Sequence, residues 1–291
     1  MTPIMRAKTK PTPTVSMPFE TLPPPLRQST RFLKRYILPS DNHGFVGRLY
    51  DLGIVTLSFD SYDELAKYPD CKYAVDVLDN VQLLARRVES LNLVGNMLWP
   101  DPLPTDFRTF PISQYDWLVV SADVFLTRYI SVVDCALHLV NEVYEAGLVP
   151  PNCTLRHLAK AGIPADLVTI LGEMLDDQGG LRDERNARIH QGEERAFTID
   201  DRSFKTASLF NHRLNGMVGT DYYGRPINVQ RSFKEGLVRL QRAFNRSTRK
   251  LVRQLDRVYD ELWDEFEDRF GPRIAAATHG LNAGSRNKRE A

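Results

Sequence analysis

Residues 229–270 read VQRSFKEGLVRLQRAFNRSTRKLVRQLDRVYDELWDEFEDRF and contain no proline. Apolar residues recur in this stretch at spacings of three, four or seven, which is typical of one face of an α-helix. They are Leu237, Leu240, Phe244, Leu251, Leu255, Val258 and Leu262. We therefore predict a single helix over about 229–270, roughly 60 Å long at 1.5 Å per residue, with these side chains in a buried seam.

Arginines repeat along the same segment, on roughly the opposite side of the predicted helix. They are Arg239, Arg242, Arg246, Arg249, Arg253 and Arg257. Residues 225–257 carry ten basic and two acidic residues, whereas residues 258–270 carry six acidic residues and one basic residue. An outward row of arginines suits a polyanion, because phosphate contacts bind nucleic acid without reading its sequence. A solubilising face, or pairing with the acidic stretch of a partner subunit, would produce the same pattern.

The preceding sequence also has helical patterning. Ser61 and Glu64 form a capping box, and further helices are predicted at 70–97, 113–146, 153–161, 164–176 and 181–197. Gly179-Gly180 is predicted to separate the last two, and residues 211–228 are predicted to form a loop or short hairpin. The only plausible strand covers residues 54–59. The predicted fold class is all-α, a helical bundle with long antiparallel helices.

The ends of the chain differ from its middle. Residues 1–30 contain seven of the 18 prolines, which predicts a disordered arm, and residues 1–35 carry seven basic residues against Glu20. The proline-rich linker 99–104 predicts a boundary between an N-terminal helical subdomain, 31–100, and a second helical domain, 101–275. Residues 276–291 are predicted to be a flexible tail.

Composition excludes several classes of protein. The net charge is +1 and 42% of residues are hydrophobic, which excludes global disorder and a uniformly basic surface. Three widely spaced cysteines favour packed, reduced thiols and a cytoplasmic protein rather than a disulfide framework or zinc site. No membrane contact is predicted, because charged residues interrupt the most apolar stretch, 117–140. No P-loop, zinc-protease or nucleophile-elbow motif is present.

One short motif suggests chemistry: Arg185-Asn186-x-x-x-His190, within LRDERNARIHQGE at 181–193. On a helix, Asn186 and His190 lie four residues apart on one face, and the long side chain of Arg185 can reach the same region. Arginine binds phosphate oxygens in a bidentate manner, and histidine transfers protons near neutral pH. These groups suit cleavage of a phosphodiester in RNA, whose own 2′-hydroxyl can be the nucleophile.

The motif and its helical context resemble the HEPN superfamily (higher eukaryotes and prokaryotes nucleotide-binding) over about residues 70–270. The resemblance implies a metal-independent endoribonuclease without a cofactor, which cleaves single-stranded RNA at a composite site in a homodimer. It implies that Arg185 stabilises phosphate charge, that His190 acts as general acid or base, and that Asn186 positions its neighbours. RNA would then be the polyanion bound by Arg239, Arg242, Arg246, Arg249 and Arg253.

Members of this superfamily serve as toxins, antiviral defence effectors or RNA-processing enzymes, so a protein inhibitor or antitoxin is a further expected partner. Others have lost catalysis, and the alternative is a non-catalytic scaffold that binds RNA, a nucleotide or a protein. The charged residues around the motif, Arg182 among them, would also fit a solvated helix face with local ion pairs.

A polar stripe on the predicted helix 113–146 provides candidate supporting groups. Asp116, Asp123, Thr127, Asp134, His138 and Asn141 fall within about 40° of Asp116 at 100° per residue. The simpler interpretation is a water-facing stripe on a core helix. The sharper hypothesis is that Asp123 or Asp134 pairs with Arg185 or orients His190, and Arg182 is a further candidate supporting residue.

Overall fold

The computed structural model describes residues 25–40, 42–192, 194–214, 216–277 and 281. In this part of the chain there are eight α-helices and no regular strand, so the predicted all-α class is confirmed. The helices are α1 (Gly44–Gly53), α2 (Tyr62–Leu65), α3 (Pro69–Leu98), α4 (Gln114–Val143), α5 (Leu155–Lys160), α6 (Ala165–Asn186), α7 (Asp201–Arg213) and α8 (Val229–Ala276).

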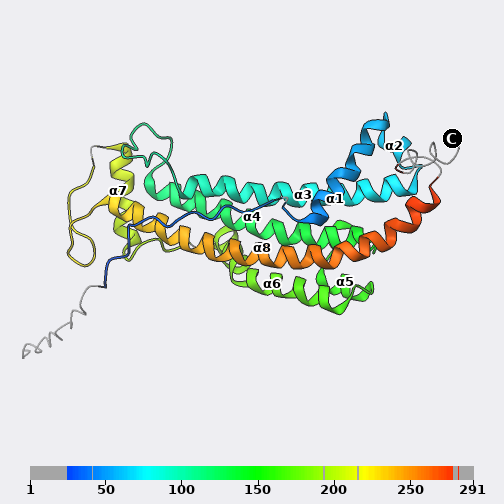
Figure 1. Cartoon of the computed structure of the whole chain (residues 1–291). Helices are drawn as coiled ribbons and strands as arrows, with labels where there is room; N and C mark the ends of the chain where they lie inside the picture. The colour runs from blue at the N-terminus through cyan, green and yellow to red at the C-terminus, as the bar shows by residue number, and fades with distance from the viewer. Residues whose placement is uncertain (1–24, 41, 193, 215, 278–280, 282–291) are drawn as a thin grey trace, which may run out of the picture.

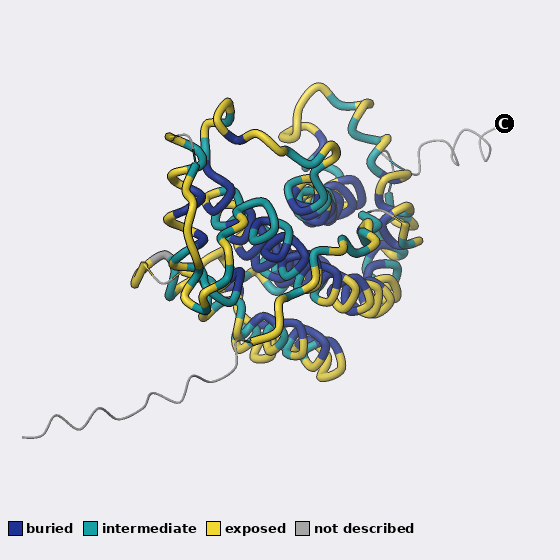
Figure 2. The backbone as a smooth tube through the Cα atoms, turned by 90° about the vertical axis from the view of Figure 1, so that its left-hand side faces the viewer, coloured by how far each residue is buried: buried dark blue, intermediate teal, exposed yellow. Residues whose placement is uncertain are grey.

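The long helices α3, α4 and α8 lie side by side along the molecule, and α6 packs against α4 and α8 (Figure 1). α3 and α6 run antiparallel to α4 and α8. Seen along the bundle, the buried segments face one another in its interior (Figure 2). All seven residues of the predicted α8 seam are buried there. The predicted long helix is therefore confirmed, and it continues six residues beyond Phe270.

Two helix starts follow from their capping residues. Ser61 accepts a hydrogen bond from the Glu64 amide at the start of α2. Ser113 forms a complete capping box with Asp116 at the start of α4, the position that the sequence predicts. The linker 99–113 joins α3 to α4, and both helices contribute to one hydrophobic core. The two predicted parts of the chain are thus packed together across that linker.

The predicted break at Gly179-Gly180 is wrong. α6 continues through both glycines to Asn186, and it is followed by a single π-helical turn, Ala187–Gln191 (η3). Two interior glycines disfavour a helix by about 1 kcal/mol each. The buried Gln178 side chain donates to the Tyr129 carbonyl of α4 immediately before them, so tertiary contacts hold the helix together.

The predicted strand at 54–59 is also wrong, because residues Ile54–Ser58 form a 3₁₀ turn directly after α1. No neighbouring strand is available to pair with this segment in the described chain, and Ile54 and Leu57 are exposed. α1 and α7 lie where no helix was predicted. The predicted hairpin is present as an antiparallel bridge between Thr220 and Pro226.

The predicted arm (1–30) and the predicted tail (276–291) lie largely outside the described residues. Residues 25–40 are described, and they form an extended segment that runs along the bundle (Figure 1). No described helix is long and apolar enough to cross a lipid bilayer. The three cysteines are buried and unpaired.

Candidate functional site

The motif lies where α6 ends and the π-helical turn begins. Arg185 and Asn186 are the last residues of α6, whereas His190 lies in the turn Ala187–Gln191. Gly192 ends the turn with a φ of 69°, a left-handed conformation that glycine adopts without strain. Isolated π-helical turns are rare and occur frequently at functional sites. The motif therefore occupies an irregular end of a helix rather than its regular interior.

The three motif side chains are accessible at this turn. The Arg185 guanidinium donates from Nε and Nη2 to Asn186 Oδ1, at 3.2 and 2.8 Å. His190 is exposed, and within the described chain its imidazole has no hydrogen-bond or ion-pair partner. A fixed cation and a free imidazole thus lie about one helical turn apart.

Carboxylates of the polar stripe on α4 do pair with arginines near the motif, but not with Arg185, the partner proposed from the sequence. Asp123 accepts from Arg188 Nε at 2.6 Å. Asp134 accepts from Arg182 Nη2 at 2.5 Å. The partner of Arg185 is Asn186 instead, so the two carboxylates anchor residues on either side of the motif.

Arg188 is the residue of the site that sequence reasoning missed. Its side chain is only 6% exposed, and its Nη2 points to the Val119 carbonyl at 3.4 Å. The Nη1 atom is buried without a partner. A basic residue in a charged segment usually predicts exposure, so nothing in the local pattern identifies Arg188 as the anchor of the turn.

The linker that follows the turn is held by a second group of charges. Glu194 accepts from Lys205 at 2.7 Å and from the Tyr115 hydroxyl at 2.6 Å. These two hydrogen bonds, that of Lys205 first, lower the pKa of the Glu194 carboxyl. The turn is therefore attached to α4 at one end and to α7 at the other.

A cluster of positive charge lies beside this linker. Burial lowers the pKa of Arg195; the nearby Glu184 carboxylate opposes this, and the positive charges of Arg239 and Arg188 add to it. The Nη1 atom of Arg195 is buried without a partner. Arg239 of α8 is therefore close to the linker that carries the motif turn.

The other predicted arginines of α8 fall into two groups. Arg242 and Arg246 are exposed, and their side chains contact no partner among the described residues. Arg249 stacks over the Tyr36 ring at 5.4 Å, and Arg253 Nε donates to the Arg249 carbonyl. Outward orientation is confirmed for four of the five predicted RNA-binding arginines, and Arg239 is half-buried.

Ion pairs between α6 and α8 fix where the motif lies along α8. Arg257 pairs with Glu173 at 2.6 Å, and Gln254 and Lys250 both contact Asp177. Because the helices are antiparallel, moving forward along α6 from Asp177 moves backward along α8. Arg185 lies about 12 Å further along α6, which places it opposite the part of α8 near residue 244, between the unpaired arginines.

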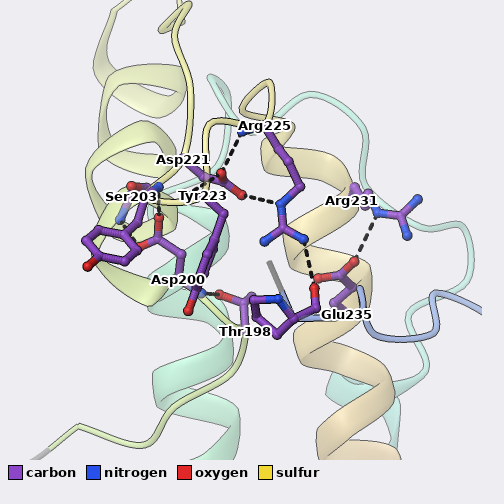
Figure 3. A network of polar contacts seen from close by, with 10 residues as sticks. Thr198, Asp200, Ser203, Asp221, Tyr223, Arg225, Arg231 and Glu235 are labelled. Atoms are coloured by element: carbon purple, nitrogen blue, oxygen red, sulfur yellow. Dashed lines mark hydrogen bonds and ion pairs between the residues drawn. The ribbon is translucent and has the colours of Figure 1, made fainter. Parts of the chain in front are cut away.

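A separate polar network lies where α7 and α8 begin (Figure 3). Asp221 accepts from Arg225 Nε at 3.0 Å, and Asp200 accepts from the Tyr222 amide at 2.7 Å. Burial by itself would raise the pKa of the Asp200 carboxyl. The hydrogen bonds from Tyr222 and Ser203 outweigh the effect of burial, so the pKa is lowered. The network ties the hairpin to the start of α7.

The cavity beside this network has a volume of about 40 Å³. That volume is far below the several hundred Å³ of a typical small-ligand site. We therefore interpret the network as structural. Within the described residues, no group of three or more histidine, cysteine or acidic side chains converges as a metal site.

Comparisons of the chain with family models, curated proteins and solved structures gave no match.

Proposed function

We propose that this chain is a metal-independent endoribonuclease that cleaves single-stranded RNA, with Arg185, Asn186 and His190 at its active site, as the HEPN resemblance implies. The observation that carries the proposal is the exposed, unpartnered imidazole of His190, one turn from the Arg185–Asn186 pair. A histidine needed only for packing would be buried or hydrogen-bonded within the protein.

The chemistry assigns one role to each side chain. The 2′-hydroxyl of RNA attacks the adjacent phosphorus, and the 5′-oxygen of the next nucleotide leaves. His190 transfers a proton to or from one of these oxygens, because histidine is the side chain that most often serves as a general acid or base. Arg185 neutralises charge on the phosphate oxygens, and Asn186 holds its guanidinium in position.

Two copies of the turn facing each other across a dimer would complete the site. His190 has no orienting partner within the described chain, and a general base is usually oriented by a third group. A second copy can supply that group. The same observation favours the alternative, a non-catalytic HEPN-like scaffold that binds RNA, a nucleotide or a protein, if the chain does not dimerise through this turn.

Cleavage of a labelled single-stranded RNA, with and without a chelator, tests the proposal. We expect cleavage by the wild type in both conditions, and a loss of about 10²–10⁴-fold in His190→Ala, the range for a lost general acid or base. His157→Ala is the matched control, because His157 lies on α5 and contacts Thr154. Equal cleavage by His190→Ala and the wild type refutes the assignment. Binding of RNA without cleavage by any variant favours the scaffold.

A further inference from the structure

The extended segment 25–40 lies along α8 and is bound by amide side chains of that helix. These amides are far from the segment in the sequence. Gln241 Oε1 accepts from the Leu33 amide at 3.0 Å. Asn245 binds the segment twice, accepting from the Tyr36 amide at 3.0 Å and donating to the Lys34 carbonyl at 2.9 Å. These amides bind main-chain groups, so they fix the path of the segment whatever its side chains are.

α3 holds the same segment from its other side. Asn92 accepts from the Leu38 amide and donates to the Leu38 carbonyl, both at 2.9 Å. The Arg35 guanidinium donates to Asn96 at 2.6 Å and lies so close to Gly95 that a Cβ there would be 2.6 Å from it. Arg35 is therefore directed onto α3.

The other three basic residues of the segment, Arg27, Arg31 and Lys34, remain on the surface. Arg31 and Lys34 are exposed, and their side chains have no partner among the described residues. At about 3.3 Å per extended residue they lie about 10 Å apart. Because the Lys34 carbonyl accepts from Asn245, the main chain of Lys34 lies against the arginine-bearing part of α8.

The angular positions around α8 show how these charges are arranged. At about 100° per residue, Gln241 and Arg249 lie within about 40° of Asn245, on the side that binds the segment. Arg242, Arg253 and Arg246 follow at about 60° to 100°. The residues that contact α6 come next, at about 120° to 180°: Lys250, Gln254 and Arg257.

The exposed arginines thus form a strip on α8 with two borders. The N-terminal segment lies along one border, with Arg31 and Lys34 exposed on it. α6 lies along the other and ends at the Arg185 turn, opposite residue 244. From Arg242 to Arg253 the strip is about 17 Å long.

We infer that residues 25–40 and α8 together form the track that binds single-stranded RNA and leads it to the motif turn, with Arg31 and Lys34 contacting phosphates. This inference rests on the proposed function and names the substrate-binding surface of that site. The segment is a fixed wall of the track, because amide side chains of α3 and α8 hold its main chain.

An extended polyanion fits this surface better than an acidic protein or a membrane does. The charges lie in a row along a helix, whereas a membrane surface requires an apolar face beside them. The two exposed hydrophobic residues of the segment, Leu26 and Ile37, lie eleven residues apart and form no such face. Arg249 and Tyr36 are already stacked, and stacked surfaces of this kind also suit RNA bases.

The test measures binding without cleavage. The probe is a 2′-O-methyl RNA of about 12 nucleotides, which lacks the attacking hydroxyl, and its affinity is measured by fluorescence anisotropy between about 50 and 200 mM salt. Each phosphate contact to a single strand contributes about 0.7 to the salt slope. Arg31→Ala/Lys34→Ala should lower the slope by about 1.4 and weaken binding about 25-fold near 0.1 M salt.

A double variant on α5, Arg156→Ala/Lys160→Ala, is the matched control. It removes the same charge from exposed positions outside the track, and we expect the wild-type slope. Arg242→Ala/Arg246→Ala should lower the slope as the segment variant does. A segment variant with the wild-type slope overturns the inference, and so does a wild type without salt-dependent binding. Equal competition by a polyglutamate peptide overturns the assignment to RNA.

The outcome is separable from that of the cleavage assay. If the segment variant binds more weakly and no variant cleaves unmodified RNA, the track stands and catalysis fails. If the wild type cleaves, His190→Ala does not, and the segment variant binds normally, catalysis stands and the track fails. Asn245→Ala adds a second readout. In the otherwise wild-type chain this substitution should weaken RNA binding. In the Arg31→Ala/Lys34→Ala background it should have no further effect.

Discussion

Removing the Asp123 carboxylate should loosen the turn that carries His190. Asp123→Ala leaves the Arg188 guanidinium with one long hydrogen bond, to the Val119 carbonyl at 3.4 Å. The Arg188 side chain is 6% exposed, so water cannot freely replace the lost carboxylate. An isolated buried charge is costly, whereas a fully exposed ion pair contributes little.

The size of the effect follows from burial on the two sides of the pair. Removing one partner of a fully buried pair costs about 3–5 kcal/mol, and an exposed pair contributes about 0.2–1 kcal/mol. Arg188 resembles the first case, but Asp123 is 49% exposed. We therefore expect Asp123→Ala to lower the free energy of unfolding by about 2 kcal/mol. That loss corresponds to about 4–8 °C in Tm.

Asp134→Ala is a matched control on the same helix. Its carboxylate is 48% exposed, almost the same as that of Asp123, but its partner Arg182 is 30% exposed. We expect a loss below about 1 kcal/mol there. Urea denaturation followed by circular dichroism measures both variants, and hydrogen exchange should show faster opening of Ala187–Gln191 in Asp123→Ala alone. Equal losses in the two variants would refute the argument that burial of Arg188 anchors the turn.

Three further predictions concern other parts of the chain. Gly179→Ala and Gly180→Ala should each raise stability by about 0.5–1 kcal/mol in urea denaturation, because both lie inside α6 with open space around them; a loss would contradict the continuous helix. The Lys205 ammonium lowers the pKa of the Glu194 carboxyl. The ionised carboxylate therefore stabilises the fold at neutral pH, and this stabilisation is lost as the pH falls through the lowered pKa. In unfolding curves measured between about pH 7 and 3, Glu194→Gln should reduce this loss of stability on the acid side. Burial raises the pKa of the Cys71 thiol to about 11, so an aromatic disulfide reagent should label it only as fast as the protein unfolds, and rapid labelling of the native protein would exclude that burial.

Spacing alone predicted the long helices because their seams are strictly periodic. α3 and α8 each bury one face, α4 is apolar over most of its circumference, and Ser113 supplies a local capping signal. The prediction failed at Gly179-Gly180, where local propensity favours a break but the Gln178 contact to α4 favours a helix. Such a contact depends on which helices become neighbours, and a sequence window does not contain that information.

The candidate site, like the fold, was predicted only in part from the sequence. Residue type and spacing selected Arg185, Asn186 and His190 as candidates, and the structure places them where α6 ends and the π-helical turn begins, with His190 exposed. Sequence reasoning assigned the α4 carboxylates to the right region but to the wrong partners. Arg182, Arg185 and Arg188 are chemically identical, and their spacing does not determine which of them is buried against α4.

The distribution of charge along α8 depends on α6 rather than on α8 alone. Glu173 and Asp177 pair with basic residues in the C-terminal part of the arginine row, so those cations are already neutralised. Further along α6, Glu184 pairs with Arg195 at 3.6 Å, and Asp183 contacts no residue of α8 among the described residues, so Arg242 and Arg246 remain unpaired. A chain with a net charge of +1 therefore keeps unpaired arginines on the part of α8 opposite the end of α6, and these arginines can attract a polyanion.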